Sequence, residues 1–225
     1  MATGLVEKIT FPCGSLSLEG LIKNHNASQG VVISHPHPLY GGDMHNYVVE
    51  LIHEAFDDLG WTTLRFNFRG VGRNQGSFDD GRGEQEDVIA AIDYLKQAGT
   101  TKIYLAGYSF GAWVNAQVAA THSEVQGSIL VSPPLAHFPF LKGDAKTLLI
   151  VTGDSDPFCP LTDLKKLMAA MDPPPPPLKI IPGADHFYSQ GSQELRRALA
   201  SVFMDRAQKN TVCLPATDCG KIQGP

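Results

Sequence analysis

The segment GYSFG, residues 107–111, places one serine between two glycines, each two positions away. An apolar run, KIYLAG, precedes it, and a helix-like segment, AWVNAQVAA, follows it. A serine on such a strand-to-helix turn has its hydroxyl exposed beside a helix N-terminus, which stabilises developing negative charge. Glycines on both sides let the backbone turn without collision. The motif fits a nucleophile or an ordinary helix cap, and it does not decide between them by itself.

Two later segments favour the nucleophile. A serine hydroxyl needs a general base to remove its proton, and that base needs a carboxylate to orient it. The run TLLIVTG ends in GDSDPFCP, and the run LKII ends in PGADHFY. An acid therefore follows one predicted strand, and His186 follows the next. We predict that Ser109 is the nucleophile, that His186 is the base, and that Asp154 or Asp156 is the acid.

The other histidines and Asp185 are expected to be structural. His53, His122 and His137 lie on a predicted helix, at a helix end and in a predicted loop. Solvated or hydrogen-bonded histidines are common in such places. Asp185 precedes His186 directly, and neighbours in sequence usually point their side chains in different directions.

A histidine-rich loop, SHPHPLYGGDMHN, covers residues 34–46 and follows the apolar run GVVIS. A phosphate loop is excluded because the Gly-Lys-Ser/Thr sequence is missing. A metal site would draw on His35, His37, His45 and Asp43. Such a site usually needs a third ligand in fixed geometry. A complete serine triad also does not need a metal for its chemistry. We therefore expect no metal and no cofactor.

The remaining elements alternate between strands and helices. Two runs near the start form a predicted hairpin, and a β-branched apolar run at 30–35 is typical of a strand buried on both faces. Apolar residues then recur at three- and four-residue steps up to Gly60, as in an amphipathic helix. The pattern predicts a mostly parallel sheet with helices on both faces and an antiparallel leading edge. Its further strands are expected at 61–68, 102–107, 127–132, 147–153 and 178–181, and its further helices at 84–95, 112–120, 161–171 and 195–203.

Composition sets the broad class of protein. The chain has 225 residues and a net charge of −5, and its basic residues are scattered. This favours a small-molecule ligand over nucleic acid or a membrane surface. No secretory signal is apparent, and the four cysteines form no C-x-x-C pair, which indicates a cytoplasmic protein with reduced thiols. We expect one domain over residues 1–208 and a flexible tail over 209–225, with a Cys213–Cys219 disulfide left open.

Five segments together resemble the α/β-hydrolase superfamily, and within it the small lidless hydrolases related to dienelactone hydrolases and short-chain carboxylesterases. The resemblance covers about residues 5–205. Its pattern G-x-x-D-x-x-x-P fits Gly153, Asp156 and Pro160, which implies that Asp156 is the acid and that Asp154 shapes the turn. The segments are HPHPLYGG, FNFRGVGRNQG, GYSFG, GDSDPFCP and GADHF.

The resemblance also implies an oxyanion hole, formed by two backbone N–H groups. One belongs to Phe110, directly after the nucleophile, and the other to the loop after the third strand. Prolines at 36 and 38 have no N–H to donate, so His37 is the leading candidate. Leu39 and Tyr40 are the alternatives.

The expected activity is cleavage of small or short-acyl carboxylic esters through an acyl-serine. The segment PPLAHFPFLKGDAK between two strands is too short for a helical cap, which favours an open site. Leu39, Tyr40, Phe158 and Phe187 are candidate substrate contacts. A thioesterase or amidase would use the same triad, and a non-catalytic ligand-binding protein could share the fold. We expect a monomer or a small homo-oligomer.

Overall fold

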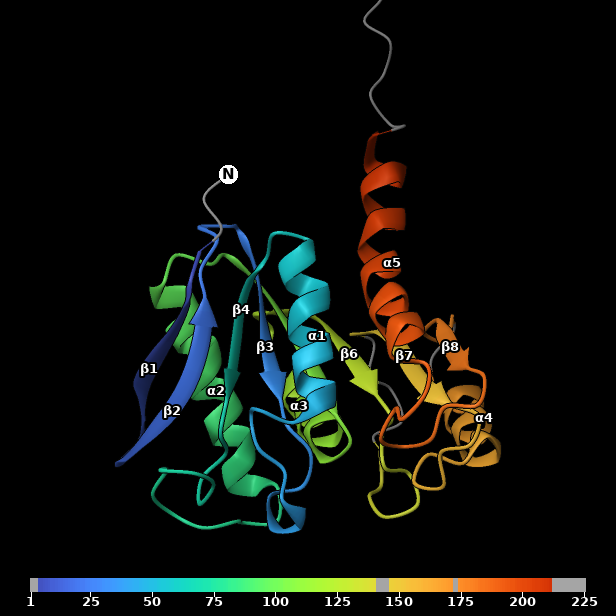
Figure 1. Cartoon of the computed structure of the whole chain (residues 1–225), viewed down its shortest axis with the longest axis horizontal. Coiled ribbons are helices and arrows are strands. Elements are labelled where there is room, and N and C mark those ends of the chain that lie inside the picture. The colour runs from blue at the N-terminus through green and yellow to red at the C-terminus, as the bar shows by residue number, and fades with distance from the viewer. Residues whose placement is uncertain (1–3, 141–145, 172–173, 212–225) are drawn as a thin grey trace, which may run out of the picture.

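An eight-stranded sheet runs through the computed structural model, which describes residues 4–140, 146–171 and 174–211 (Figure 1). The strand order is β1-β2-β4-β3-β5-β6-β7-β8. The β1–β2 and β2–β4 pairs are antiparallel, and all the other pairs are parallel. The predicted fold class, including its antiparallel leading edge, is confirmed. The strands are β1 (Val6–Cys13), β2 (Leu16–Lys23), β3 (Gln29–Ser34), β4 (Thr62–Phe66), β5 (Lys102–Tyr108), β6 (Val125–Val131), β7 (Thr147–Gly153) and β8 (Leu178–Ile181).

Helices cover both faces of the sheet (Figure 1). Val31 and Ile33 of β3 pack on one face with apolar side chains of α1 and α5. Val32 points to the other face, where α2 and α3 pack. Strand side chains alternate between the two faces, so a continuous apolar run such as that of β3 serves two cores. The helices are α1 (Tyr47–Asp58), α2 (Arg82–Gln97), α3 (Phe110–Thr121), α4 (Leu161–Ala169) and α5 (Ser192–Thr211), with a 3-10 turn, η1 (Pro38–Tyr40).

Local signals explain where the first helices begin. The Asn46 side chain accepts a hydrogen bond from the N–H of Val48 at the start of α1. At α2, the buried Glu84 accepts hydrogen bonds from the N–H groups of Asp79 and Gly81. In the next turn of the same helix, Asp87 accepts hydrogen bonds from the guanidinium group of Arg69.

Connections at the carboxyl ends of the strands bring the predicted site residues to one edge of the sheet. The β6–β7 connection spans 132–146, and residues 141–145 lie outside the described part. Helix α5 runs to Thr211, three residues into the segment expected to be a tail. The rest of that segment, with Cys213 and Cys219, is also outside the described residues. Within the described ranges, no helix is long and apolar enough to cross a membrane.

Candidate active site

Ser109 sits on the sharp turn between β5 and α3, with φ 54° and ψ −121°. A positive φ is unfavourable for a residue with a side chain, so the surrounding structure must hold it. The two flanking glycines make this turn possible. A Cβ at Gly107 would collide with the backbone of Gly111, and a Cβ at Gly111 would collide with the carbonyl of Ser34. The turn thus packs tightly against the end of β3.

The three predicted triad residues form one hydrogen-bonded chain. The Oγ of Ser109 lies 3.0 Å from Nε2 of His186. Nδ1 of His186 lies 2.9 Å from each carboxylate oxygen of Asp156. All three side chains are buried, although they come from the ends of β5, β7 and β8. The structure thus brings together residues that are up to 77 positions apart in the sequence.

The carboxylate of Asp156 is held in its ionised form. The N–H groups of Phe158 and Cys159 donate to its Oδ1 at 2.9 and 3.1 Å. Burial by itself would raise the pKa of Asp156, but hydrogen bonds from His186, Ser132 and Phe158 hold that pKa below its usual value. An ionised carboxylate only accepts hydrogen bonds, so Nδ1 of His186 carries the proton. In the neutral imidazole, Nε2 is then free to accept the proton of Ser109.

The other two acids near the site have local partners. Asp154 is exposed, and its Oδ1 accepts a hydrogen bond from the N–H of Gly183 at 2.8 Å. Asp185 accepts hydrogen bonds from the N–H groups of Phe187 and Ser189. These bonds, with that of the Ser189 hydroxyl, hold the pKa of Asp185 below its usual value. Both carboxylates stabilise the turns that carry Asp156 and His186.

A further pair of hydroxyl groups supports the acid. Ser132, at the end of β6, lies 3.1 Å from the Tyr188 hydroxyl through its Oγ. Both residues are buried, and both have a positive φ, 46° for Ser132 and 53° for Tyr188. The sequence analysis missed this pair, because nothing in the local pattern distinguishes Ser132 from other strand-end serines.

The loop at 34–46 shows that its histidines have different tasks. His35 is fully buried, its Nδ1 lies 2.6 Å from the carbonyl of Pro36, and its Nε2 accepts the N–H of Phe68 at 3.0 Å. Burial lowers the pKa of His35 to about 4, so it stays neutral. His45 is exposed. Across the described ranges, no group of three His, Cys, Asp or Glu side chains could hold a metal ion.

The backbone donors of this loop fall into two classes. The N–H of Leu39 donates to Nδ1 of His37 at 3.2 Å, and that of Tyr40 to the carbonyl of His37 at 3.1 Å. Within the described residues, the N–H groups of His37 and Phe110 have no hydrogen-bond partner. Phe110 begins α3, where the first N–H groups have no partner inside the helix. Of the candidates, only His37 and Phe110 therefore offer a free N–H.

A cavity of about 600 Å³ opens over Ser109 and His186. The predicted substrate contacts Tyr40, Phe158 and Phe187 line it. Leu39 is not among the lining residues, so its contact with substrate stays a prediction. Its side chain, on the 3-10 turn, is 68% exposed. The other lining residues are Pro36, His37, Gly41, Gly42, Asn46, Tyr108, Phe110, Pro134, His137 and Phe138.

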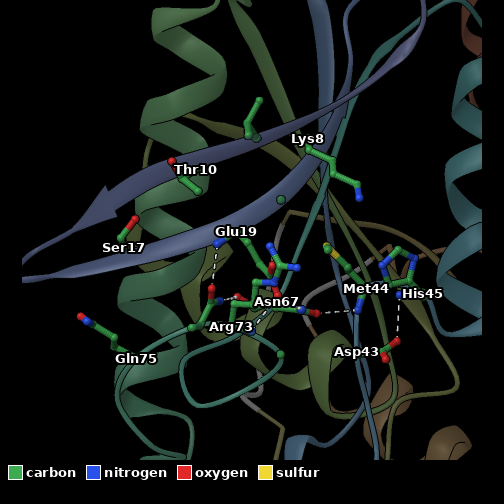
Figure 2. Close-up of a pocket in the computed structure, with 14 residues that line it drawn as sticks. Lys8, Thr10, Ser17, Glu19, Asp43, Met44, His45, Asn67, Arg73 and Gln75 are labelled. Carbon is green, nitrogen blue, oxygen red and sulfur yellow. Dashed lines mark hydrogen bonds between the residues drawn. The ribbon is translucent and has the colours of Figure 1, made fainter.

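A second cavity, of about 630 Å³, lies beside the 34–46 loop and contains none of the triad residues (Figure 2). Its wall shows how the loop is held. Oδ1 of the buried Asn67 accepts the N–H of Met44 at 2.8 Å, and its Nδ2 donates to Glu19 at 2.7 Å. Asn67 therefore ties the loop to β2. Sequence reasoning missed it, although an asparagine between two phenylalanines in the predicted strand was an available signal.

Known proteins share the sequence pattern of this chain. A model of the α/β-hydrolase fold matches residues 37–149. The protein belongs to the α/β-hydrolase family. This α/β-hydrolase is also 37% identical over 179 residues to an uncharacterized protein of Rickettsia prowazekii, a match that covers 75% of each chain. The predicted resemblance to the superfamily is thereby confirmed.

Solved structures agree with this assignment. An α/β serine hydrolase homologue from Coxiella burnetii is 38% identical, with a TM-score of 0.79, and the match covers 89% of this α/β-hydrolase and 98% of that chain. A protein of Xanthomonas campestris, described as an α/β serine hydrolase without a lid, is 31% identical. It also has a TM-score of 0.79, with coverage of 95% and 97%.

Proposed function

We propose that this α/β-hydrolase is a serine esterase that cleaves small or short-acyl carboxylic esters through an acyl-Ser109 intermediate. The observation that carries the proposal is the hydrogen-bonded chain from Ser109 through His186 to the ionised Asp156. The strained turn at Ser109 holds the hydroxyl ready at the floor of the cavity.

Acylation follows from this geometry. The Oγ of Ser109 attacks the carbonyl carbon of the ester, and Nε2 of His186 takes the hydroxyl proton. The carbonyl oxygen becomes negative, and the N–H groups of His37 and Phe110 stabilise it. Each such donor contributes roughly 100- to 1,000-fold to kcat in serine hydrolases. Asp156 keeps the imidazole oriented and stabilises its positive charge.

Collapse of the tetrahedral intermediate completes the acylation of Ser109. The bond to the alcohol oxygen breaks, and His186 returns the proton from Nε2 to that oxygen, so the alcohol leaves and acyl-Ser109 remains. Water then enters, gives a proton to His186 and attacks the acyl carbon. The carboxylic acid is released, and the proton returns to Ser109. Every proton is carried by His186, and the steps draw on no cofactor.

The size and surroundings of the cavity support small substrates. A volume of about 600 Å³ suits a small molecule. The short β6–β7 connection and the description of the Xanthomonas campestris protein as lacking a lid are consistent with an open site. The descriptions of both solved relatives as serine hydrolases support the class of enzyme.

Labelling with a fluorophosphonate probe tests the proposal. Wild type should be labelled and should hydrolyse short p-nitrophenyl esters, whereas Ser109→Ala and His186→Ala should do neither. Ser155→Ala is the matched control, because Ser155 is exposed and, among the described residues, its hydroxyl bonds only to Asp154. A well-folded wild type without label and without hydrolysis would refute the proposal. Paired ester, thioester and amide substrates with the same acyl group then establish which bond is preferred.

A further inference from the structure

Two separate groups of rings line the active-site cavity. The His37 wall consists of His37, Phe110 and Phe138, with ring centroids 4.9 Å apart for His37–Phe110 and 5.6 Å for Phe110–Phe138. The His186 wall consists of Phe158, Phe187 and His137. Phe158 lies 4.5 Å from the imidazole of His186. Among the described residues, no ring contact joins the two walls.

The chemistry of ester cleavage assigns a different part of the substrate to each wall. The oxyanion donors belong to the backbone of His37 and Phe110, so the carbonyl oxygen points toward the His37 wall. Nε2 of His186 must deliver its proton to the leaving oxygen, which therefore lies within hydrogen-bond reach of the imidazole. The alcohol part begins at that oxygen. It consequently lies against the rings that surround His186.

The His186 wall is aromatic, and Phe158 is its anchored member. The ring centroids of Phe158 and Phe187 lie 4.5 and 5.6 Å from that of His186. The centroid of His137 lies 5.6 Å from that of Phe158. The backbone of Phe158 is anchored, because its N–H donates to Asp156. The ring is thus held by the same turn that holds the acid.

Charge is missing from the whole lining. The described residues that line the cavity include no carboxylate, ammonium or guanidinium group. A charged alcohol group would lose its hydration there without gaining a partner. Flat aromatic walls favour a flat aromatic ligand, because rings gain offset or edge-to-face interactions beyond the burial of apolar area.

We infer that the His186 wall binds a planar, uncharged aromatic ring in the alcohol part of the substrate, so that arylmethyl esters are the preferred class. The inference rests on the proposed function, because it needs His186 to protonate a leaving alcohol. It names the alcohol as the part of the substrate that the enzyme selects.

Benzyl acetate and cyclohexylmethyl acetate provide a matched test. They share the acyl group, both leaving groups are unactivated primary alcohols, and their six-membered rings differ in aromaticity. Wild type should prefer the benzyl ester by roughly 2- to 12-fold in kcat/KM, the range expected for aromatic pairing. The acetate of 4-carboxybenzyl alcohol should react more slowly than benzyl acetate, because its carboxylate would lose its hydration in the cavity.

Two variants locate the preference. Phe158→Leu and Phe187→Leu should bring the benzyl-to-cyclohexylmethyl ratio close to one. Phe138→Leu, on the His37 wall, should keep the wild-type ratio. Phe187 is 63% exposed, so its substitution should not disturb folding, and it decides the matter if Phe158→Leu is unstable. Methyl phenylacetate and methyl cyclohexylacetate carry the same rings on the acyl side, and their ratio should not respond to the substitutions at Phe158 and Phe187.

The outcomes separate this inference from the proposed function. A wild type that is labelled by fluorophosphonate and hydrolyses both acetates, yet shows a ratio near one, overturns the inference and leaves the esterase proposal intact. A ratio that survives in both Phe158→Leu and Phe187→Leu also overturns it. A folded wild type with neither label nor hydrolysis defeats the proposed function itself.

Discussion

The hydroxyl of Tyr108 donates a hydrogen bond of 2.8 Å to the backbone carbonyl of His186, and both groups are buried. Tyr108 directly precedes Ser109 in the chain. The bond therefore connects the turn of the proposed nucleophile to the turn of the proposed base, across 78 positions of sequence. The two rings also pack against each other, with centroids 5.2 Å apart.

Tyr108→Phe should weaken this connection while keeping the ring. The carbonyl of His186 loses its donor, which should lower the free energy of unfolding by about 1–3 kcal/mol. A less firmly held imidazole should lower kcat by roughly tenfold with little change in KM. Urea unfolding and steady-state kinetics measure both effects. Tyr104→Phe, on the same strand, is the control, because the Tyr104 hydroxyl has no partner in the described part of the chain. Equal kinetics for the two variants would contradict the positioning role of Tyr108.

Asp156→Asn should reveal which acid orients the base. An amide in place of the carboxylate allows the wrong tautomer of His186, and kcat should fall by roughly 1,000- to 10,000-fold. Asp154→Asn should retain most of the activity, because an amide oxygen still accepts the N–H of Gly183. Ester hydrolysis by the two variants, each checked by circular dichroism, distinguishes the acids. The assignment fails if Asp154→Asn is the more damaging change.

Gly42→Ala should displace the loop that carries His37. The added Cβ would collide with the carbonyl groups of Pro36 and His37. A misplaced oxyanion donor should cost roughly 100-fold in kcat, since small displacements have effects of this size. Gly41→Ala is the matched comparison, because the space there is open and only its φ of 78° is strained. The free energy of unfolding of Gly41→Ala should fall by about 1–2 kcal/mol. Its kcat should fall much less than that of Gly42→Ala. Similar kcat losses in both variants would argue against His37 as a donor.

The buried His35 should make stability depend on pH. Its pKa is about 4 in the folded chain and 6.5 when unperturbed, so the unfolded chain takes up the proton first as the pH falls. The free energy of unfolding should therefore decline between about pH 6.5 and pH 4, by up to about 3 kcal/mol. His53, whose pKa burial also lowers to about 4, acts in the same direction.

Urea unfolding at pH 7.5 and pH 4.5 measures this decline. His35→Gln should make the decline shallower, because the amide oxygen still accepts the N–H of Phe68 without titrating. His45→Gln, at an exposed position, should leave the decline as in wild type. An equally steep decline in His35→Gln would show that other groups are responsible.

The fold and the meeting of Ser109, Asp156 and His186 could be predicted because their signals are local. Apolar periodicity identified the strands and helices, and the parallel topology then required the loops after successive strands to meet at one edge. Proline chemistry contributed too, since residues 36 and 38 cannot donate, and the N–H of His37 has no partner among the described residues.

The remaining contacts depend on three-dimensional packing. Leu39 and Tyr40 are adjacent, yet only Tyr40 is among the residues that line the cavity. Both lie in a 3-10 turn, where successive residues are rotated by about 120°. The bonds of Asn67 to Met44 and Glu19 span 23 and 48 positions. A single sequence carries no periodic signal for such pairings.

Costly backbone conformations gather around the site. The described chain has five non-glycine residues with a positive φ, and three of them, Ser109, Ser132 and Tyr188, lie at or directly behind the triad. Each such residue disfavours folding locally, so the two cores must supply the compensating stability. Random stabilising substitutions should therefore accumulate far from this edge of the sheet. Substitutions that remove the strained conformations at this edge should raise the free energy of unfolding but lower kcat. The turn at Ser109 therefore limits how far the enzyme can be stabilised without loss of activity.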